Sequence, residues 1–327
     1  MKLRIATRRS ALALVQSNWV AAQLQRHEPG LAVELVEVVT QGDRIQDVSL
    51  ADIGGKGLFV SEVEQVLLRG EAELAVHSLK DVPAELADGL LLAAVPERED
   101  PRDVLVTPNA AALDDLEVGV RVGTNSLRRT LQLRRQRNDL VYAMLRGNVD
   151  TRLRKLISGE YQAIVLAAAG LRRLGLFERP LWPIPVEISV PSVGQGALAL
   201  EARADDQRTR ALLAHIDHEP SRACVEAERE FLAALGGDCH TPLAGHAQLL
   251  DDGRRVRFDG WVAAPDGDQH VRASSDAWLD ANQTLPELAR RVAAEVAKTL
   301  LAGGAKAMID CATQAAAARQ RDPRARN

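Results

Sequence analysis

A lysine and an aspartate stand side by side in AVHSLKDVPAEL, the stretch from residue 75 to residue 86. The apolar run that ends at Val76 has the pattern of a short buried strand, so Lys80 and Asp81 are expected just beyond its end, where Pro83 stops the strand. There an ammonium group can bind an anion, and a carboxylate can stabilise a cation or carry a proton. A solvated surface turn would have the same composition, and this segment alone does not separate the two interpretations.

Several arginines occupy comparable positions. They follow predicted strands or fall in the first turn of predicted helices: Arg8, Arg9, Arg128, Arg129, Arg146 and Arg152. In open α/β sheets ligands collect at the carboxyl ends of strands, where helix N-termini add N–H donors and positive potential. A cation at a helix start opposes the helix dipole, so helix stability does not explain Arg128 and Arg129, whereas a polyanionic ligand would. The alternative is a set of solvated arginines.

Cys239 lies on a glycine-flanked loop, GGDCHTP, where a thiol would be accessible. Cys224 and Cys311 instead fall in or beside predicted helices and are expected to be packing residues. An inert thiol is the default for a lone loop cysteine, and a Cys–His nucleophile would need the imidazole to face the sulfur, which adjacent residues seldom allow. Three cysteines cannot all pair, which fits free thiols in a reducing cytoplasm.

Two glycine-rich segments match nucleotide-binding loops only in part. Gly57 stands where a phosphate loop has the Ser or Thr that binds magnesium. The segment GQGALA, residues 194–199, is not followed by the acidic residue that a dinucleotide-binding unit places about twenty positions later. The residues around His240 and His246 lack a zinc-ligand spacing. We therefore predict neither a nucleotide site nor a metal site.

The elements that would position these residues alternate between strands and helices. Strands are expected over residues 3–6, 31–40, 74–76, 120–124, 140–145 and 163–168, and helices over residues 10–25, 58–68, 126–135 and 149–157. Ser10 and Ser126 are expected to cap their helices. In the first helix, the apolar residues on one face are Leu12, Val15, Trp19 and Ala22. This order favours parallel sheets covered on both faces.

Composition shifts divide the chain. The charged, proline-broken segment 97–103 predicts a crossing between two α/β units, and the Pro- and Gly-rich segment 185–196 predicts a return. Beyond residue 235, strand patterns with Asp-Gly turns and an Ala-rich helix predict a small α+β unit. We therefore predict a first α/β domain over residues 1–97 plus 196–215, a second over 98–195, a third domain over 216–312, and a disordered tail over 313–327.

The totals limit the classes of function. Hydrophobic residues make up 46% of the chain and charged residues 26%, as in a globular protein with a real core, and the net charge of −4 argues against a general nucleic-acid binder. No apolar run reaches the roughly 18 residues that span a membrane. Arg8 and Arg9 would interrupt the apolar region of a signal peptide. Without a heptad pattern or a long apolar edge, we expect a cytoplasmic monomer.

With these motifs assembled, the chain strongly resembles the porphobilinogen deaminase family, whose members are also called hydroxymethylbilane synthases. The resemblance runs to about residue 310 and rests on RIATRRSALAL, GGKGLFVSEVE, AVHSLKDVP, EREDPRDVLV, GTNSLRR, LRGNVDTRL, LAAAGLRRLGL, VGQGALALE and the cysteine loop. Such transferases of haem biosynthesis condense four porphobilinogen molecules into a linear tetrapyrrole and release ammonia. The implied fold is two periplasmic-binding-protein-like α/β domains, with the active cleft between them, and a smaller α+β domain that carries the cofactor.

The resemblance also implies roles for individual residues. The product would grow on a dipyrromethane cofactor held by a thioether to Cys239, and Asp81 would be the catalytic carboxylate. The acetate and propionate arms would be bound by Arg8, Ser10, Ser78, Lys80, Thr124, Ser126, Arg128, Arg129, Arg146, Arg152 and Arg173. If Lys80 paired with Asp81 it would weaken the carboxylate, so Lys80 is expected to point towards a substrate arm.

Two details of this assignment stay open. The glycine-rich segment before Leu58 gives Lys56 and Phe59 the freedom to act as a cover over the cleft. Asn125 and the Asp238–His240 segment depart from the common family pattern, which leaves the cofactor contacts there undetermined. Two other functions compete with this reading: a non-enzymatic binder of small anions, since the two-lobed fold also serves that role, and a transferase with a cysteine nucleophile.

Overall fold

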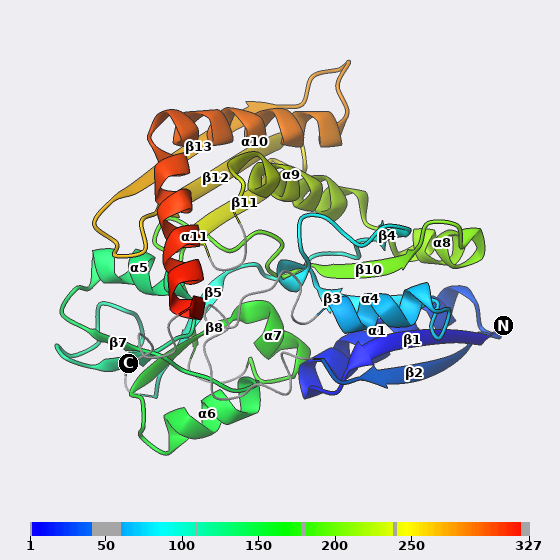
Figure 1. Ribbon diagram of the computed structural model, residues 1–327, viewed down its shortest axis with the longest axis horizontal. Helices are drawn as coiled ribbons and strands as arrows, with labels where there is room; N and C mark the ends of the chain where they lie inside the picture. The colour runs from blue at the N-terminus through cyan, green and yellow to red at the C-terminus, as the bar shows by residue number, and fades with distance from the viewer. Residues whose placement is uncertain (1, 41–59, 109, 178–180, 238–240, 322–327) are drawn as a thin grey trace.

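The computed structural model describes residues 2–40, 60–108, 110–177, 181–237 and 241–321 of the chain. These residues form three β-sheets, each with helices packed against it (Figure 1). No helix among them is long and apolar enough to cross a membrane.

The first sheet is a five-stranded sheet with the order β2-β1-β3-β10-β4. Its strands are β1 (Lys2–Arg8), β2 (Ala32–Val38), β3 (Leu74–Ser78), β4 (Leu90–Ala94) and β10 (Leu198–Arg203). Its helices are α1 (Ala11–His27), α4 (Ser61–Leu68) and α8 (Gln207–Leu213). Because side chains alternate along a strand, Leu3 and Ile5 pack with α1 and α8 on one face, whereas Ala6 packs with α4 on the other. Strand β1 runs parallel to β2 and β3, and β10 is antiparallel to β3 and β4.

The second sheet has the order β7-β6-β8-β5-β9. Its strands are β5 (Asp103–Val106), β6 (Arg121–Gly123), β7 (Val141–Ala143), β8 (Ala163–Ala167) and β9 (Leu181–Pro183), with helices α5 (Leu127–Gln136), α6 (Val149–Ile157) and α7 (Ala168–Arg173). Strand β6 is parallel to β7 and β8, and β5 is antiparallel to β8 and β9. Both sheets thus have three parallel strands at one end and an antiparallel strand next to the far edge. This pair of matching sheets confirms the two α/β units expected from the sequence.

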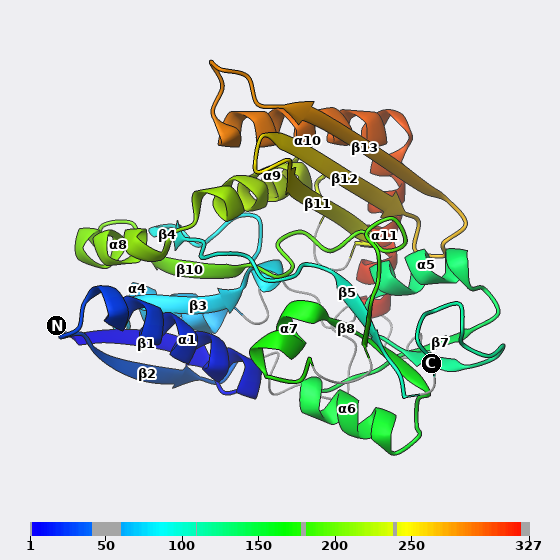
Figure 2. The same cartoon turned by 180° about the vertical axis from the view of Figure 1, so that it is seen from behind.

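The third sheet is an antiparallel meander of β11 (Leu243–Leu250), β12 (Arg255–Ala263) and β13 (His270–Trp278). Helices α9 (Glu219–Leu235) and α10 (Leu285–Ala302) cover one face, and Figure 2 shows the sheet from the opposite side. The core between them contains Phe231, Phe258, Val292, Val296 and Leu300. The expected α+β unit is confirmed.

The chain crosses between the first two sheets twice. Residues 95–102 lead from β4 to β5, and residues 184–197 lead from β9 back to β10, which completes the first sheet between β3 and β4. A single-turn helix, η1 (Leu79–Asp81), follows β3 directly, and a second, η2 (Ala214–Ile216), follows α8. The exact domain boundaries given above stay a prediction.

Two expectations from the sequence differ from the structure. Val15 and Trp19 are 36% and 43% exposed, and Ala22 is exposed too, because α1 packs on its sheet through the neighbouring face. The buried residues of that face are Ala13, Gln16, Ser17, Val20, Ala21 and Leu24. The tail expected to be disordered from residue 313 is helical through Arg321, since α11 (Ala305–Arg321) continues along an Ala-rich sequence with high helix propensity. Residues 322–327 lie outside the described residues.

Candidate active site

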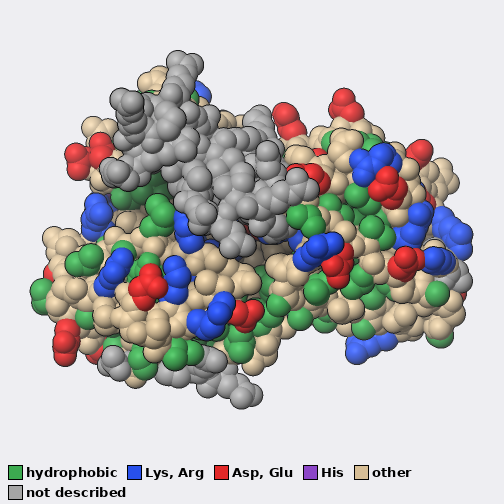
Figure 3. Space-filling view, turned by 60° about the horizontal axis from the view of Figure 1, so that its bottom comes forward, with side chains coloured by type: hydrophobic (Ala, Val, Ile, Leu, Met, Phe, Trp, Pro, Cys, Tyr) green, Lys and Arg blue, Asp and Glu red, His purple; other side chains and the backbone are tan. Residues whose placement is uncertain are grey.

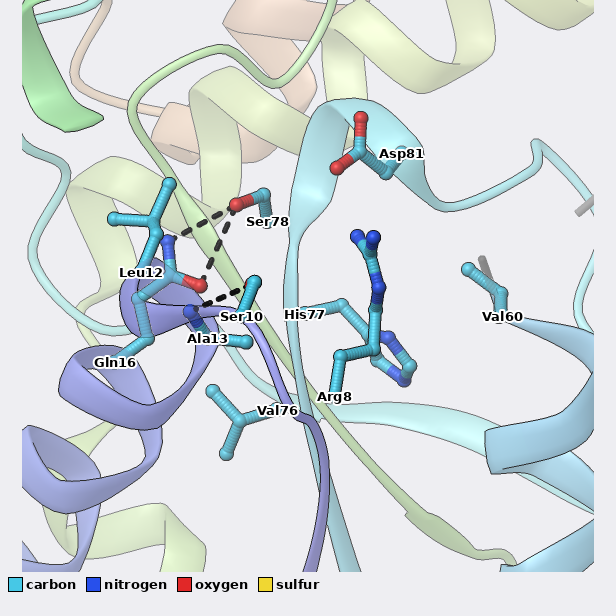
Figure 4. Close-up of a pocket in the computed structure, with 10 residues that line it drawn as sticks. All are labelled: Arg8, Ser10, Leu12, Ala13, Gln16, Val60, Val76, His77, Ser78 and Asp81. Atoms are coloured by element: carbon cyan, nitrogen blue, oxygen red, sulfur yellow. Dashed lines mark hydrogen bonds between the residues drawn. The ribbon is translucent and has the colours of Figure 1, made fainter. Parts of the chain in front are cut away.

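A small cavity of about 60 Å³ lies where β1 and β3 end and α1 begins (Figure 4). Its lining includes Arg8 at the end of β1, Ser10 at the start of α1, and Ser78 and Asp81 at and just beyond the end of β3. Figure 4 shows the Arg8 guanidinium pointing towards the Asp81 carboxylate across this space. Four of the residues predicted from the sequence to form the site therefore share one cavity.

Local hydrogen bonds give this cavity its shape. The Ser10 hydroxyl caps α1 by accepting a bond from the Ala13 N–H at 3.3 Å, as expected of a serine at this position. The buried Gln16 amide, one turn further on, donates to the Ser78 hydroxyl at 3.0 Å. The second turn of α1 is thereby attached to the end of β3.

Lys80 extends from η1 towards the second crossing. Its Nζ donates a hydrogen bond to Gln195 Oε1 at 3.3 Å. Burial, together with the nearby Arg129 guanidinium, lowers the pKa of Lys80 to about 8, although Asp81 and Asp103 act in the opposite direction. Within the described residues, Lys80 and Asp81 form no ion pair, and the expectation that Lys80 points towards a substrate arm stays a prediction.

Arg128 and Arg129 are buried in the first turn of α5, and both contact Asp103 at the start of β5. Arg128 places Nη1 2.8 Å from Asp103 Oδ2 and Nη2 3.1 Å from Oδ1, and Arg129 Nε lies 2.9 Å from Oδ1. The Ser189 hydroxyl donates a further bond to Asp103 Oδ2. Burial alone would raise the pKa of Asp103, but the two guanidinium groups hold it well below its usual range.

This cluster changes the interpretation of the two arginines. The sequence argument that stability does not explain them overlooked an internal partner, which lies 25 and 26 positions away along the chain. One carboxylate between two guanidinium groups still leaves a net positive charge, so the cluster adds positive potential to the junction between the two sheets.

The three other predicted arginines, which lie around the second sheet, are Arg146, Arg152 and Arg173. Arg146 Nε lies 3.2 Å from Met144 Sδ. Arg152 Nε donates to the Gly147 carbonyl at 2.7 Å, and burial lowers its pKa to about 10, with Arg129 and Arg146 acting in the same direction and Asp81 opposing them. Arg173 Nη2 donates to the Gly196 carbonyl at 2.7 Å, and burial lowers its pKa to about 10. Arg152 is thus electrostatically coupled both to the predicted catalytic carboxylate and to the buried arginine cluster.

Two predicted hydroxyl donors serve local structure in the second sheet. Ser126 caps α5, since its hydroxyl accepts a bond from the Arg129 N–H at 3.4 Å. Thr124 is buried, and its Oγ1 accepts from the Ser126 N–H at 3.3 Å. The expected cap at Ser126 is confirmed, as is the one at Ser10.

Several predicted site residues lie outside the described residues: Cys239 with its neighbours Asp238 and His240, and the proposed cover residues Lys56 and Phe59. In the space-filling view, Lys and Arg side chains are spread over this face of the molecule among Asp and Glu side chains (Figure 3). Among the described residues, no group of three or more His, Cys, Asp or Glu side chains could hold a metal ion.

Comparison with known proteins decides the family. The model of the dipyrromethane cofactor-binding domain of porphobilinogen deaminase matches residues 3–211, and the model of the C-terminal domain of the same enzyme matches residues 222–302. The chain belongs to the porphobilinogen deaminase family. A porphobilinogen deaminase from Brevibacillus brevis is 48% identical over 304 residues, which cover 93% of this chain and 95% of that relative.

Solved structures of other proteins are more distant. A probable amino-acid transporter extracellular-binding protein from Bacillus subtilis is 11% identical, with a TM-score of 0.42 over 71% of this chain and 96% of that one. A periplasmic solute-binding protein from Desulfovibrio salexigens is 12% identical, with a TM-score of 0.39 over 71% of this chain and 76% of that one.

The chemistry of the donors fits the dipyrromethane cofactor of the porphobilinogen deaminase family. A dipyrromethane with carboxylate arms needs cations and hydroxyl donors, and the cavity supplies Arg8, Ser10 and Ser78. Lys80 and Arg152 both interact electrostatically with Asp81 and so add positive charge to the surroundings of that carboxylate. Sequence reasoning missed Asp103, which pairs with Arg128 and Arg129, and it missed Gln195, which bonds Lys80 and Arg129. Asp103 belongs to the segment 97–103 that was interpreted as a charged crossing.

Proposed function

We infer that the protein condenses four porphobilinogen molecules into the linear tetrapyrrole hydroxymethylbilane, with release of ammonia, as a transferase of porphyrin biosynthesis. Similarity to a porphobilinogen deaminase over almost the whole length of both chains supports this activity. The structural observation that carries it is the placement of Asp81 in one cavity with Arg8, Ser10 and Ser78.

Asp81 is the residue to which we assign the chemistry. Loss of ammonia turns porphobilinogen into a cation whose charge is delocalised onto the pyrrole nitrogen, and a nearby carboxylate favours that cation over the neutral substrate. At a separation of about 4 Å and an effective dielectric constant near 20, the attraction is roughly 4 kcal/mol. Since about 1.4 kcal/mol corresponds to a tenfold change in rate, Asp81 would contribute about a thousandfold. A carboxylate at this place can also accept the proton that the attacking pyrrole ring loses.

The cationic and hydroxyl residues are assigned to the acidic arms. Guanidinium and ammonium groups pair with carboxylates through charge-assisted hydrogen bonds, and the acetate and propionate of each pyrrole unit supply such carboxylates. Among these residues, Arg8 points towards Asp81 in the cavity, and Lys80 and Arg152 interact with Asp81 electrostatically. Arg128 and Arg129 already share Asp103, so their contribution is the net positive charge of that cluster.

The cofactor is assigned to the loop that follows α9. We propose a thioether between the dipyrromethane and Cys239, so that the chain grows while attached to the third unit of the fold. When bound, the dipyrromethane supplies the pyrrole carbon to which the first substrate unit is joined. Lys56 and Phe59 are proposed to cover the cleft. We further propose that the protein acts as a monomer in the cytoplasm without a nucleic-acid or membrane partner.

The intact mass of the purified protein tests the cofactor. The mass is expected to exceed that of the sequence by one dipyrromethane, and Cys239→Ser is expected to remove the excess. A non-enzymatic anion binder would carry no excess mass, and a cysteine-nucleophile transferase would turn over without it. Either result would overturn the proposal.

Turnover of an Asp81→Asn variant tests the catalytic role. We expect this variant to keep the excess mass and to consume porphobilinogen at least about a hundredfold more slowly, because the charge that stabilises the cation is gone. Asp88→Asn is the matched control, since Asp88 is an exposed carboxylate seven positions further along the same segment. Near-normal turnover of Asp81→Asn would exclude the charge-stabilising role.

A further inference from the structure

Gln195 is a buried residue, 1% exposed, on the second crossing between the sheets. Its neighbours Gly194 and Gly196 have positive φ angles of 70° and 91°. A Cβ atom added at Gly194 would lie 2.1 Å from Leu79 Cδ2, and one added at Gly196 would lie 2.3 Å from the Glu99 carbonyl oxygen. The crossing therefore presses directly against η1 and against the first crossing, and the backbone fixes where the Gln195 side chain begins.

The contacts of the Gln195 amide also fix its orientation. Its Nε2 donates to the Pro101 carbonyl at 2.7 Å and to Asp103 Oδ1 at 2.8 Å. Its Oε1 accepts from Lys80 Nζ and from Arg129 Nη2, both at 3.3 Å. A reversed amide would place its NH₂ group against two cations and its oxygen against two acceptors. The Gln195 oxygen therefore bonds both Lys80, which follows β3 of the first sheet, and Arg129, which lies on α5 beside the second sheet.

Lys80 has two possible partners of different kinds. Asp81 is its neighbour in the sequence, yet among the described residues the hydrogen-bond acceptor of the Lys80 ammonium is the neutral Gln195 oxygen. The charged groups around this ammonium are Asp81 on η1, Arg128 and Arg129 on α5, and Asp103 on β5. Arg128 and Arg129 repel it, and Asp103 keeps Arg128, Arg129 and Ser189 as donors when Gln195 is removed. The anion left for Lys80 is then Asp81.

We propose that Gln195 is a positioning residue that holds the Lys80 ammonium away from Asp81, and so leaves the Asp81 carboxylate available to the substrate cation. This inference rests on the proposed catalytic role of Asp81. A cation bonded to that carboxylate would cancel much of its attraction for a second cation, because both compete for one negative charge. The same contact presents the ammonium to the substrate arms at the junction of the two sheets.

Turnover of a Gln195→Met variant tests the proposal, since methionine has a similar length but no acceptor oxygen. We expect Lys80 to turn to Asp81 and kcat to fall about tenfold, as for a partly neutralised transition-state contact. Adding Lys80→Met to this variant is expected to raise kcat, whereas Lys80→Met alone is expected to lower it. A packing defect would not reverse the sign of the Lys80 effect. Failure of the second substitution to restore any turnover would overturn the proposal.

A direct measurement on Lys80 separates this inference from the proposed function. The chain has only six lysines, so the side-chain NMR signals of the holoenzyme can be assigned by single substitutions. In Gln195→Met the pKa of Lys80 is expected to rise, and Asp81→Asn in that background is expected to reverse the rise. An unchanged or lower pKa of Lys80 in Gln195→Met would overturn the inference, whether or not the wild-type enzyme turns over porphobilinogen. If that pKa rises but the wild-type enzyme shows no turnover, only the proposed function is overturned.

Two further variants complete the design. Ser192→Ala is the matched control, because Ser192 contacts the same Gln195 oxygen at 3.5 Å but leaves the lysine contact in place; kcat and the Lys80 pKa are expected to be unchanged. If Gln195→Met does not fold, Gln195→Ala removes the same acceptor with a smaller side chain. The pKa of Lys80 is again expected to rise and Asp81→Asn to reverse the rise, and a Lys80 pKa that did not rise would contradict the proposal.

Discussion

Replacing Asp103 by asparagine is expected to destabilise the protein strongly. The side chain is fully buried, and it accepts bonds from Arg128, Arg129, Ser189 and Gln195. Asparagine keeps the shape but loses the charge, and at one position it presents an NH₂ group to donors. Two guanidinium groups with side chains only 6% and 7% exposed would then be left without a counter-charge.

The burial of the two guanidinium groups sets the size of the expected loss in stability. Removing one partner of a buried, hydrogen-bonded ion pair costs about 3–5 kcal/mol, because the remaining charge stays in a poor solvent. For a chain of this size, about 2 °C of melting temperature per kcal/mol corresponds to a fall of roughly 6–10 °C. The loss should appear in the free energy of unfolding of the holoenzyme, measured by urea titration.

A surface pair provides the control for this measurement. Arg69 Nε lies 2.6 Å from Glu71 Oε1, but both side chains are about half exposed. Glu71→Gln is therefore expected to change the free energy of unfolding by less than about 1 kcal/mol. If Asp103→Asn cost no more than this control, the carboxylate would not be what offsets the burial of the two arginines.

The pH dependence of stability has a definite sign. The pKa of Asp103 is lower in the folded protein than in the unfolded chain, so its contribution is fully present above the unfolded pKa of about 4. As the pH falls towards the folded pKa, the contribution is lost. The stability difference between the wild type and Asp103→Asn should therefore shrink below about pH 4, and a difference that stayed constant down to acid unfolding would contradict the assignment.

Three further predictions follow from the described contacts. Gly245→Ala is expected to cost about 2 kcal/mol in a urea titration, since the new methyl group would lie 2.7 Å from the Phe231 ring in a packed core; no loss would mean that the ring can move aside. Burial raises the pKa of Cys224 to about 12, whereas Cys311 is exposed. Iodoacetamide at about pH 8 is expected to label Cys311 and spare Cys224 in the native protein, as peptide masses would show, and rapid labelling of the buried thiol would refute this. Thr284→Ala removes the cap of α10 and is expected to lower the free energy of unfolding by about 1 kcal/mol; a loss near zero would show that the cap contributes nothing.

Local signals in the sequence predicted much of the fold. Ser10 and Ser126 precede apolar-periodic segments, and both cap helices in the structure. Parallel strands end at the same edge of a sheet, so residues after β1 and β3 were expected together, and Arg8 and Asp81 do line one cavity. These inferences succeed because they depend on neighbours within a few positions or on a general rule of sheet topology.

Long-range polar pairing was not predictable in the same way. The face of α1 that packs on the sheet includes Gln16 and Ser17, whose side chains find partners in Ser78 and Thr7 on the adjacent strands. A periodicity argument assigns such polar residues to solvent, because it cannot see those partners. Asp103 is the same case, since its place beside two arginines exists only after the second sheet has formed.

The position of β10 has a consequence for how the protein is made. This strand lies between β3 and β4, yet it leaves the ribosome after every strand of the second sheet. The first sheet therefore stays incomplete until the second sheet has been synthesised. Until then the backbone N–H and C=O groups of β3 and β4 that pair with β10 have no partner strand. A nascent chain stalled before residue 198 would leave the edges of β3 and β4 open to pairing with other chains, so completion of the first sheet is a late step of biosynthesis.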